Sequence, residues 1–288
     1  MYKYYKKYVP YLFLLPAGII LILFFFIPFF ETILLSFFDY NTNIYHPSFV
    51  SLANYTALLK SPLFYKVLIN TFIYLIAAVP FLVVFPLIIA IMINQKIRGI
   101  TLYKILIYLP VSIVVAAIAF KWLYAQQGIL NYVMALFHIE PVGWLTDPNI
   151  ALYSVILVTV WKGIGYYMMI YLSALMSVPK DLYEACEVDG ANPITKHLTV
   201  TLPHLMPTIG LVTMISSISA MKVFVEIYVM TKGGPLDSSK TIVYYIYERA
   251  FENLDLGIAS AASVILLVIV LVMSILNFTL FENKQYQL

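Results

Sequence analysis

Three ionisable side chains, Lys162, Lys222 and Glu226, lie inside long apolar segments of this sequence. An ionised group in hydrocarbon is costly, so such residues are by default candidates for a solute path, an ion path or a gate. Lys222 and Glu226 stand about one helical turn apart and could pair with each other. An internal ion pair that lets a kinked helix pack is an equally good interpretation of these two residues.

The third of these residues, Lys162, is followed closely by Gly163 and Gly165. The glycines could interrupt a helix there, and Lys162 could then bind the freed backbone carbonyls or a neighbouring helix. Both alternatives remain open, as does a role for Lys162 in a solute path or an ion path.

The composition identifies the environment of these residues. The 288 residues are 62% hydrophobic and 11% charged, and the mean hydropathy is +0.92, so we expect an integral membrane protein. A net charge of +3 is too small to favour a nucleic-acid partner. The single Cys186 excludes an intrachain disulfide, and with four scattered histidines we expect no metal site. No Gly-rich phosphate loop followed by Lys-Ser or Lys-Thr is present, so any ATP dependence must come from a partner.

The apolar segments predict an all-α protein with six transmembrane helices. The segment nearest the N-terminus is interpreted as an uncleaved first span, because no small-residue cleavage site follows it. We expect an interfacial helix within the loop after the third span. The six predicted spans are Tyr8 to Phe30, Val67 to Gln95, Ile105 to Ala125, Ile150 to Ser177, Leu205 to Met230 and Leu256 to Phe281.

A polar stretch, residues 178–207, separates the fourth and fifth spans. Pro179 can open a helix, and Gly190 can end it in the left-handed conformation. Asn192 and Pro193 then offer an N-cap and a first-turn proline, so a second helix can run to about Leu202, before Pro203. The stretch is therefore predicted to form a helix, a turn and a helix, with small and apolar residues on one face of the first helix.

Six spans place both termini on one side of the membrane. Positive residues favour the cytoplasmic side, and the count is nine against five if the termini lie there. The nine are Lys3, Lys6, Lys7, Lys96, Arg98, Lys104, Lys180, Lys196 and Lys284, and the five are Lys60, Lys66, Lys232, Lys240 and Arg249. This orientation puts residues 178–207 in the cytoplasm, where they can meet a soluble protein.

The polar stretch resembles a known motif. Glu184-Ala185-Cys186 is followed by Asp189-Gly190-Ala191 and, at the expected distance, by Leu202-Pro203. This pattern is similar to the EAA loop in permease subunits of binding-protein-dependent ABC importers, in the branch of maltose, multiple-sugar and glycerol-3-phosphate permeases. Supporting strings are Gly143 to Asn149, Trp161 to Gly165, Val178 to Ala185, Tyr228 to Pro235 and Tyr244 to Tyr247.

The resemblance implies a type I importer fold and a division of the chain into three parts. Residues 1–65 would form the first helix and an external loop, 66–281 the transmembrane core with its coupling loop, and 282–288 a cytoplasmic tail. The loop would be a coupling helix that sits in a groove of an ATPase subunit. The residues carried over to this contact are Leu182, Glu184, Ala185, Cys186, Asp189, Gly190, Ala191, His197 and Pro203. Glu184 would contact a basic residue of the ATPase, although a solvated helix face is the structural alternative.

Two residues depart from the family pattern. Cys186 stands where Ala is usual, which keeps a small side chain, and His197 stands where an aromatic residue such as Phe is usual. His197 could fill the same position as a flat ring.

The resemblance also implies partners and a solute. The chain would be a non-enzymatic subunit of the bacterial inner membrane. Its expected partners are a second homologous permease, an ATPase dimer that holds ATP and Mg, and an extracellular or periplasmic binding protein. Sugars bind aromatic faces and polar side chains, and candidates for a sugar path, with Lys162 and Glu226, are Tyr166, Tyr167, Ser216, Ser217, Ser219 and Phe224. Many of the 24 Tyr and 19 Phe must instead serve interfaces or packing.

Three other functions remain open at this point. The same scaffold could carry glycerol-3-phosphate-like solutes. An ion-gradient-driven secondary transporter could use Lys162, Lys222 and Glu226 as an ion relay, although the internal repeats typical of that class are not visible in the sequence. A membrane scaffold could recruit a soluble partner through its loop without transporting anything.

Overall fold

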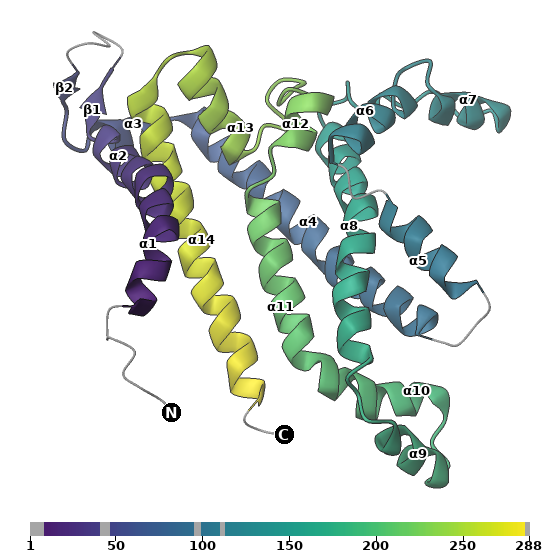
Figure 1. Cartoon of the computed structure of the whole chain (residues 1–288). Coiled ribbons are helices and arrows are strands. Elements are labelled where there is room, and N and C mark those ends of the chain that lie inside the picture. Colours follow the sequence, from purple (N-terminus) through teal and green to yellow (C-terminus); the bar gives the residue numbers. More distant parts are fainter. Residues whose placement is uncertain (1–8, 41–46, 95–98, 110–112, 286–288) are drawn as a thin grey trace. The chain divides into compact units, whose positions relative to one another are not determined.

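A computed structural model describes residues 9–40, 47–94, 99–109 and 113–285 of the chain (Figure 1). Several basic residues of the orientation count lie outside these ranges, namely Lys3, Lys6, Lys7, Lys96 and Arg98, as does the side chain of Lys284. The regular secondary structure of the described part is helical apart from a pair of two-residue antiparallel strands, β1 (Phe38–Asp39) and β2 (Ser48–Phe49). The all-α prediction is therefore confirmed.

The chain forms two compact units, each described by itself. The first comprises Met1–Ser61 and Ile246–Leu267, and the second comprises Pro62–Tyr245 and Val268–Leu288. The predicted division at residues 65 and 281 stays a prediction.

The first unit contains a long apolar helix and a small hydrogen-bonded cap. The helix consists of α1 (Val9–Leu21), the π-helical segment η1 (Ile22–Phe26) and α2 (Ile27–Leu35). Beyond the strands and α3 (Ala53–Lys60), the unit takes in η4 (Glu248–Glu252) and the start of α14 (Leu256–Gln285). The Asn54 side chain donates to the carbonyls of Ser36 and Phe38 at 2.9 and 3.0 Å, which joins α3 to the end of α2.

The second unit holds most of the predicted functional residues. Its buried centre is α8 (Ala151–Leu175), which packs against α4 (Pro62–Ile93) and α11 (Leu202–Met221) (Figure 1). Its shorter elements are α5 (Ile100–Tyr108), α6 (Ile113–Leu123), α7 (Ile129–Leu136), α9 (Lys180–Val188), α10 (Pro193–Lys196), the π-helical η3 (His197–Thr201) and α12 (Val225–Met230). Helix α13 (Ile242–Tyr247) crosses the boundary between the units.

Five helices in the described residues are long and apolar enough to cross a membrane, and they agree with five of the six predicted spans. Of the predicted third span, the structure describes α5 and α6, and residues 110–112 between them lie outside the described part. The helix expected in the following loop is present as α7.

The glycines after Lys162 do not interrupt α8, which runs unbroken from Ala151 to Leu175. They instead allow close packing. A Cβ atom at Gly165 would overlap the carbonyl oxygen of Ile107 in α5, and one at Gly163 would overlap a methyl group of Leu82 in α4. Small residues let helices approach closely in membranes, and here they bring α4 and α5 against α8.

We expect Gly165→Ala to destabilise the protein by about 1–3 kcal/mol, because the added methyl group meets backbone atoms that cannot rotate away. Gly163→Ala should cost less, since the end of the flexible Leu82 side chain can move. The control is Gly18→Ala, because no atom lies within 4 Å of a Cβ placed at Gly18. The midpoint of thermal aggregation in detergent measures the effect. Equal midpoints for the Gly165 and Gly18 variants would contradict this account of the packing.

Candidate functional site

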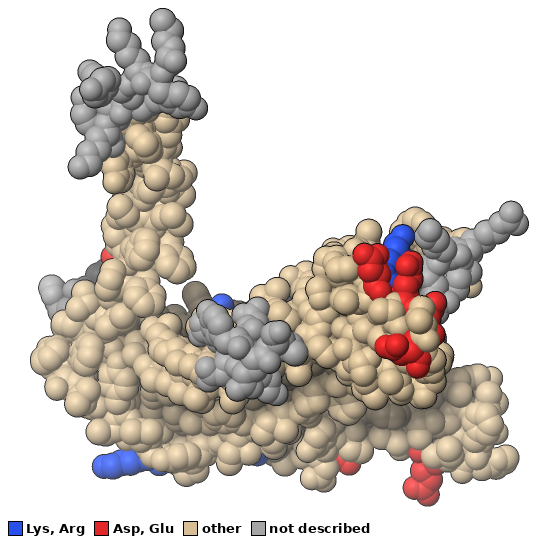
Figure 2. Space-filling model, turned by 90° about the horizontal axis from the view of Figure 1, so that it is seen from below, with Lys and Arg blue, Asp and Glu red and all other residues tan. Residues whose placement is uncertain are grey.

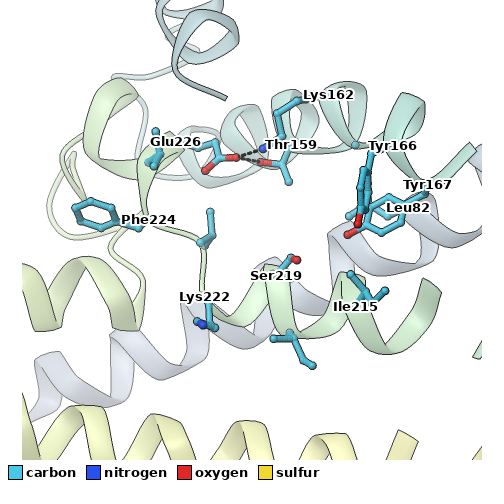
Figure 3. Close-up of a pocket in the computed structure, with 15 residues that line it drawn as sticks. Leu82, Thr159, Lys162, Tyr166, Tyr167, Ile215, Ser219, Lys222, Phe224 and Glu226 are labelled. Atoms are coloured by element: carbon cyan, nitrogen blue, oxygen red, sulfur yellow. Dashed lines mark hydrogen bonds and ion pairs between the residues drawn. The ribbon is translucent and has the colours of Figure 1, made fainter. Parts of the chain in front are cut away.

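A cavity of about 490 Å³ lies between α8, α11 and the chain that links α11 to α12, with Leu82 of α4 at one side (Figure 3). Its wall is mainly apolar and aromatic, with a few polar groups. The residues that line it are Leu82, Thr159, Lys162, Gly163, Tyr166, Tyr167, Ile215, Ile218, Ser219, Ala220, Lys222, Val223, Phe224, Val225 and Glu226.

The strongest polar contact of the cavity joins Lys162 of α8 to Glu226 of α12. The Lys162 ammonium lies 2.6 Å from a Glu226 carboxylate oxygen, and the two side chains are only 13% and 7% exposed. The hydroxyl of Thr159, one turn before Lys162, donates to the same oxygen at 3.5 Å, and the Tyr74 hydroxyl of α4 lies 2.5 Å from that of Thr159. The pair therefore connects three helices through a chain of hydrogen bonds.

The predicted pairing of Lys222 with Glu226 is wrong, because the two residues do not belong to one helix. Helix α11 ends at Met221, and α12 begins at Val225. Phe224, between them, has φ −138° and ψ −57°, outside the helical range. One-turn spacing brings side chains together only in a continuous helix. Because of this break, Glu226 contacts Lys162, and Lys222 lies on the α11 side of the cavity (Figure 3).

The break itself is stabilised from the loop that follows α12. The Thr241 hydroxyl donates to the carbonyl of Val223 at 3.2 Å, which satisfies one backbone group freed by the interruption. Asn70 of α4 donates to the carbonyls of Asp237 and Lys240 at 2.9 and 3.1 Å, and the Thr71 hydroxyl accepts from the backbone of Ile242 at 2.9 Å. The loop is thus anchored to α4, and it holds the non-helical segment in place.

Six of the eight residues predicted for the solute path line this cavity. Tyr166, Tyr167 and Phe224 provide ring surfaces, and Ser219 of α11 provides a hydroxyl group. Lys162 and Glu226 complete the six.

The other two serines lie elsewhere. Ser216 is fully buried and donates to the Thr213 carbonyl at 3.2 Å, and Ser217 faces Met273 and Asn277 of α14. Ser217 is two residues before Ser219, so helical spacing places it on a different face of α11. Ser216 is three residues before Ser219, so helical spacing alone does not exclude it from the cavity wall. Thr159 is a cavity residue outside the predicted set, although its place one turn before Lys162 puts it on the same helix face.

The second candidate site is the helical pair at residues 180–201, which has the predicted form. Helix α9 ends before Gly190, whose φ of +72° is left-handed, and the Asn192 side chain accepts from the Thr195 backbone at 2.8 Å as the cap of α10. The predicted end of the second helix at Leu202 is wrong, because α10, η3 and α11 form one continuous helical run.

The continuity past Pro203 has a local cause. A proline within an α-helix lacks its N–H and clashes with the carbonyl four residues earlier. Just before Pro203, the Leu202 N–H bonds to the His197 carbonyl, five residues back, so the helix is widened there into a π-turn. Segment η1 precedes Pro28 of α2 in the same way.

The helical pair exposes four large apolar side chains. Leu182, Val188, Ile194 and Leu198 are 46, 88, 71 and 57% exposed. Acidic side chains gather around this surface (Figure 2), where Asp181, Glu184, Glu187 and Asp189 are all exposed. Apolar residues ringed by charge are typical of a protein interface.

Other residues of the pair bind each other. Lys196 forms an ion pair with Glu187 and so joins the two helices. The hydroxyl of Thr201 contacts the Tyr183 hydroxyl at 2.9 Å and Nδ1 of His197 at 3.0 Å. His197 and Cys186 are half-buried between the helices, whereas Leu182, Glu184, Ala185, Asp189 and Gly190 are exposed. His197 is therefore turned partly inward, toward its own loop.

Removing one partner of the cavity ion pair should be costly. We expect Glu226→Ala to destabilise the protein by about 3–5 kcal/mol, because it leaves a buried charge unpaired. The double variant Lys162→Met, Glu226→Leu should recover most of this loss, since apolar residues of similar volume replace both charges. Glu187→Ala, at the exposed pair with Lys196, is the control and should cost less than about 1 kcal/mol.

Thermal unfolding in detergent compares these variants. A double variant no more stable than Glu226→Ala alone would show that the charge pairing is not the cause of the loss.

The chain is similar to permease proteins of bacterial transport systems. It is 32% identical to the probable ABC transporter permease protein YurN of Bacillus subtilis, over 96% of this chain and 97% of the relative. It is also 32% identical to the arabinooligosaccharides transport system permease protein AraP of the same organism, over 96% of this chain and 90% of the relative. A solved structure of a bacterial ABC transporter involved in the import of the acidic polysaccharide alginate shares its fold, with a TM-score of 0.85 and 25% identity over 96% of both chains.

The family described as "Binding-protein-dependent transport system inner membrane component" matches residues 50–281. That range contains the cavity, the helical pair at 180–201 and four of the five long apolar helices. The family predicted from the EAA-like motif is confirmed, and so is the predicted permease fold. The chain belongs to the inner membrane components of binding-protein-dependent transport systems.

Proposed function

We propose that the chain is the permease subunit of an ATP-driven importer that moves an oligosaccharide or a related solute inward. The observation that carries this proposal is the continuous helical run from Pro193 to Met221. It begins in the exposed helical pair and ends at the wall of the cavity. A displacement of the helical pair is therefore transmitted to the solute path along one helical run, without an intervening flexible loop.

The proposed partner of the helical pair is an ATPase subunit, which would hold ATP and Mg. Leu182, Val188, Ile194 and Leu198 would enter an apolar groove, and Glu184 would meet a basic residue at its rim. Within the predicted contact set, the half-buried His197 and Cys186 would support the loop from inside, together with Ala191 and Pro203. Exposed Asp189 and Gly190 form the turn.

The remaining proposed partners are a second permease of the same family, a second ATPase domain and a solute-binding protein outside the membrane. The family description supports the binding protein. The span Val9–Leu35 has no buried residue, and its apolar surface is suited to lipid or to a second permease. We place both termini and the helical pair in the cytoplasm, on the distribution of positive residues.

The cavity suits a saccharide, since aromatic faces pack on sugar rings and a few polar groups orient the hydroxyls. Tyr166 and Phe224 offer ring faces, and Ser219 and Thr159 offer hydroxyls. The relative AraP, which by its name transports arabinooligosaccharides, supports this class of solute.

The coupling role is tested by Gly190→Trp and Glu184→Lys in the complete transporter, reconstituted in liposomes. Each variant should lower solute uptake at least about tenfold while the protein stays inserted, because the ATPase contact loses its fit or its charge. The controls are Gly99→Trp and Glu140→Lys. Gly99 also has a positive φ, with no atom within 4 Å of a Cβ placed there, and Glu140 is an exposed acid outside the loop.

Co-purification of the ATPase and the rate of sugar-stimulated ATP hydrolysis are measured beside uptake. Normal uptake and normal ATPase binding in both loop variants would overturn the coupling role. Uptake that continues without the ATPase would instead indicate a secondary transporter.

The solute path is tested by Tyr166→Ala, which removes a 43% exposed ring from the cavity wall. We expect the apparent affinity for the transported sugar to fall about tenfold, equivalent to about 1.4 kcal/mol, because the stacking face is lost. Tyr132→Ala in α7 is the control, since Tyr132 is 67% exposed and is absent from the cavity wall. An equal effect of both substitutions on uptake would argue against a solute contact at Tyr166.

A further inference from the structure

The charges on the cavity wall do not balance. Among the described residues that line it, Lys162, Lys222 and Glu226 carry formal charges. Lys162 and Glu226 form a close pair at 2.6 Å, so their fields largely cancel at a distance. Lys222 then leaves the described wall with one excess positive charge.

Lys222 is placed where a solute could reach it. It is the residue that caps the C-terminal end of α11, and it is exposed. Ser219 precedes it by three residues, so the two side chains share a face of α11, and both line the cavity. Figure 3 shows Lys222 on the α11 side, apart from the Lys162–Glu226 pair on the opposite wall.

An ammonium group in apolar surroundings attracts an anion more strongly than it does in water. The Lys162–Glu226 pair presents no net charge at the opposite wall, so the excess charge draws the anionic group of an acidic solute to the Lys222 side. We propose that the cavity takes a saccharide with an anionic group, a carboxylate or a phosphate, which contacts Lys222 while a sugar ring packs on Tyr166 or Phe224. This inference rests on the proposed function and adds the class of solute.

The excess charge can be measured without knowing the natural solute. In the complete transporter, Cys186→Ala removes the single native thiol of this chain, Ser219→Cys places a thiol in the cavity, and labelling is measured on this chain after its separation from the other subunits. The rates of labelling by the anionic sulfonatoethyl methanethiosulfonate and the cationic trimethylammonium-ethyl methanethiosulfonate are compared, each normalised to a free thiol. We expect the anionic reagent to be favoured, and Lys222→Gln to lower the ratio of the two rates about fivefold.

Two variants control for the substitution itself. Lys222→Arg keeps the charge and should keep the ratio. Lys60→Gln removes an exposed lysine of α3, in the other unit, and should leave the ratio unchanged. A cationic preference before Lys222 is changed, or a ratio that Lys222→Gln leaves unaltered, would overturn the proposal. Either result would mean that Lys222 does not set the charge that a solute meets in the cavity of the assembled transporter.

A second measurement tests the solute class. Trigalacturonate, neutral maltotriose and glycerol 3-phosphate are compared for protection of the thiol at position 219 from labelling. Trigalacturonate should protect at about tenfold lower concentration than maltotriose, and the difference should vanish with Lys222→Gln. Protection by glycerol 3-phosphate alone would assign the charge to a small phosphorylated solute without a saccharide ring and would contradict the ring contact.

The outcomes separate this inference from the proposed function. Equal protection by the acidic and neutral trisaccharides, or protection by neither, overturns the acidic class. ATP-driven uptake of a neutral sugar by the same preparation would leave the importer function standing. Loss of the importer function would instead appear as uptake that does not depend on ATP.

Discussion

The arrangement of the second unit depends on one electrostatic requirement, which is that a lysine inside a bundle of apolar helices must find a negative partner. Lys162 meets Glu226 at 2.6 Å, and this is possible because the chain leaves the helical path between Met221 and Val225. The interruption exposes backbone groups, and the loop after α12 supplies Thr241 to bind one of them. Ion pair, helix break and anchored loop therefore form one interdependent assembly around the cavity.

The two prolines that follow π-turns show a second constraint. Pro28 and Pro203 each stand near the start of a helix that continues an earlier one, and a widened turn precedes each. The wider turn avoids the clash between a proline ring and the preceding carbonyl without ending the helix. In the second unit this makes the segment from Pro193 to Met221 continuous, and it is the continuity that joins an exposed loop to an internal cavity.

Much of the fold can be predicted from apolar length, and the helical pair from its turn chemistry. Gly190 and Asn192 have the conformations that their residue types favour, because those are local properties. The partner of Glu226 cannot be predicted in this way, since helical spacing assumes a helix that the structure interrupts at Phe224. The continuity through Pro203 escapes prediction for the opposite reason, because a π-turn leaves no clear sequence signal. Gly163 and Gly165 are ambiguous, because a glycine can serve a break or a close contact, and only the neighbouring α4 and α5 decide between them.

The bonds between α9 and the following helix have a mechanical consequence. Lys196 pairs with Glu187, and the Tyr183 hydroxyl contacts that of Thr201, so two different positions tie the two helices together. A hinge at Gly190 alone would let one helix swing and dissipate an applied displacement. With these ties the pair has low compliance, and a displacement of either helix is passed to the other as a rigid rotation.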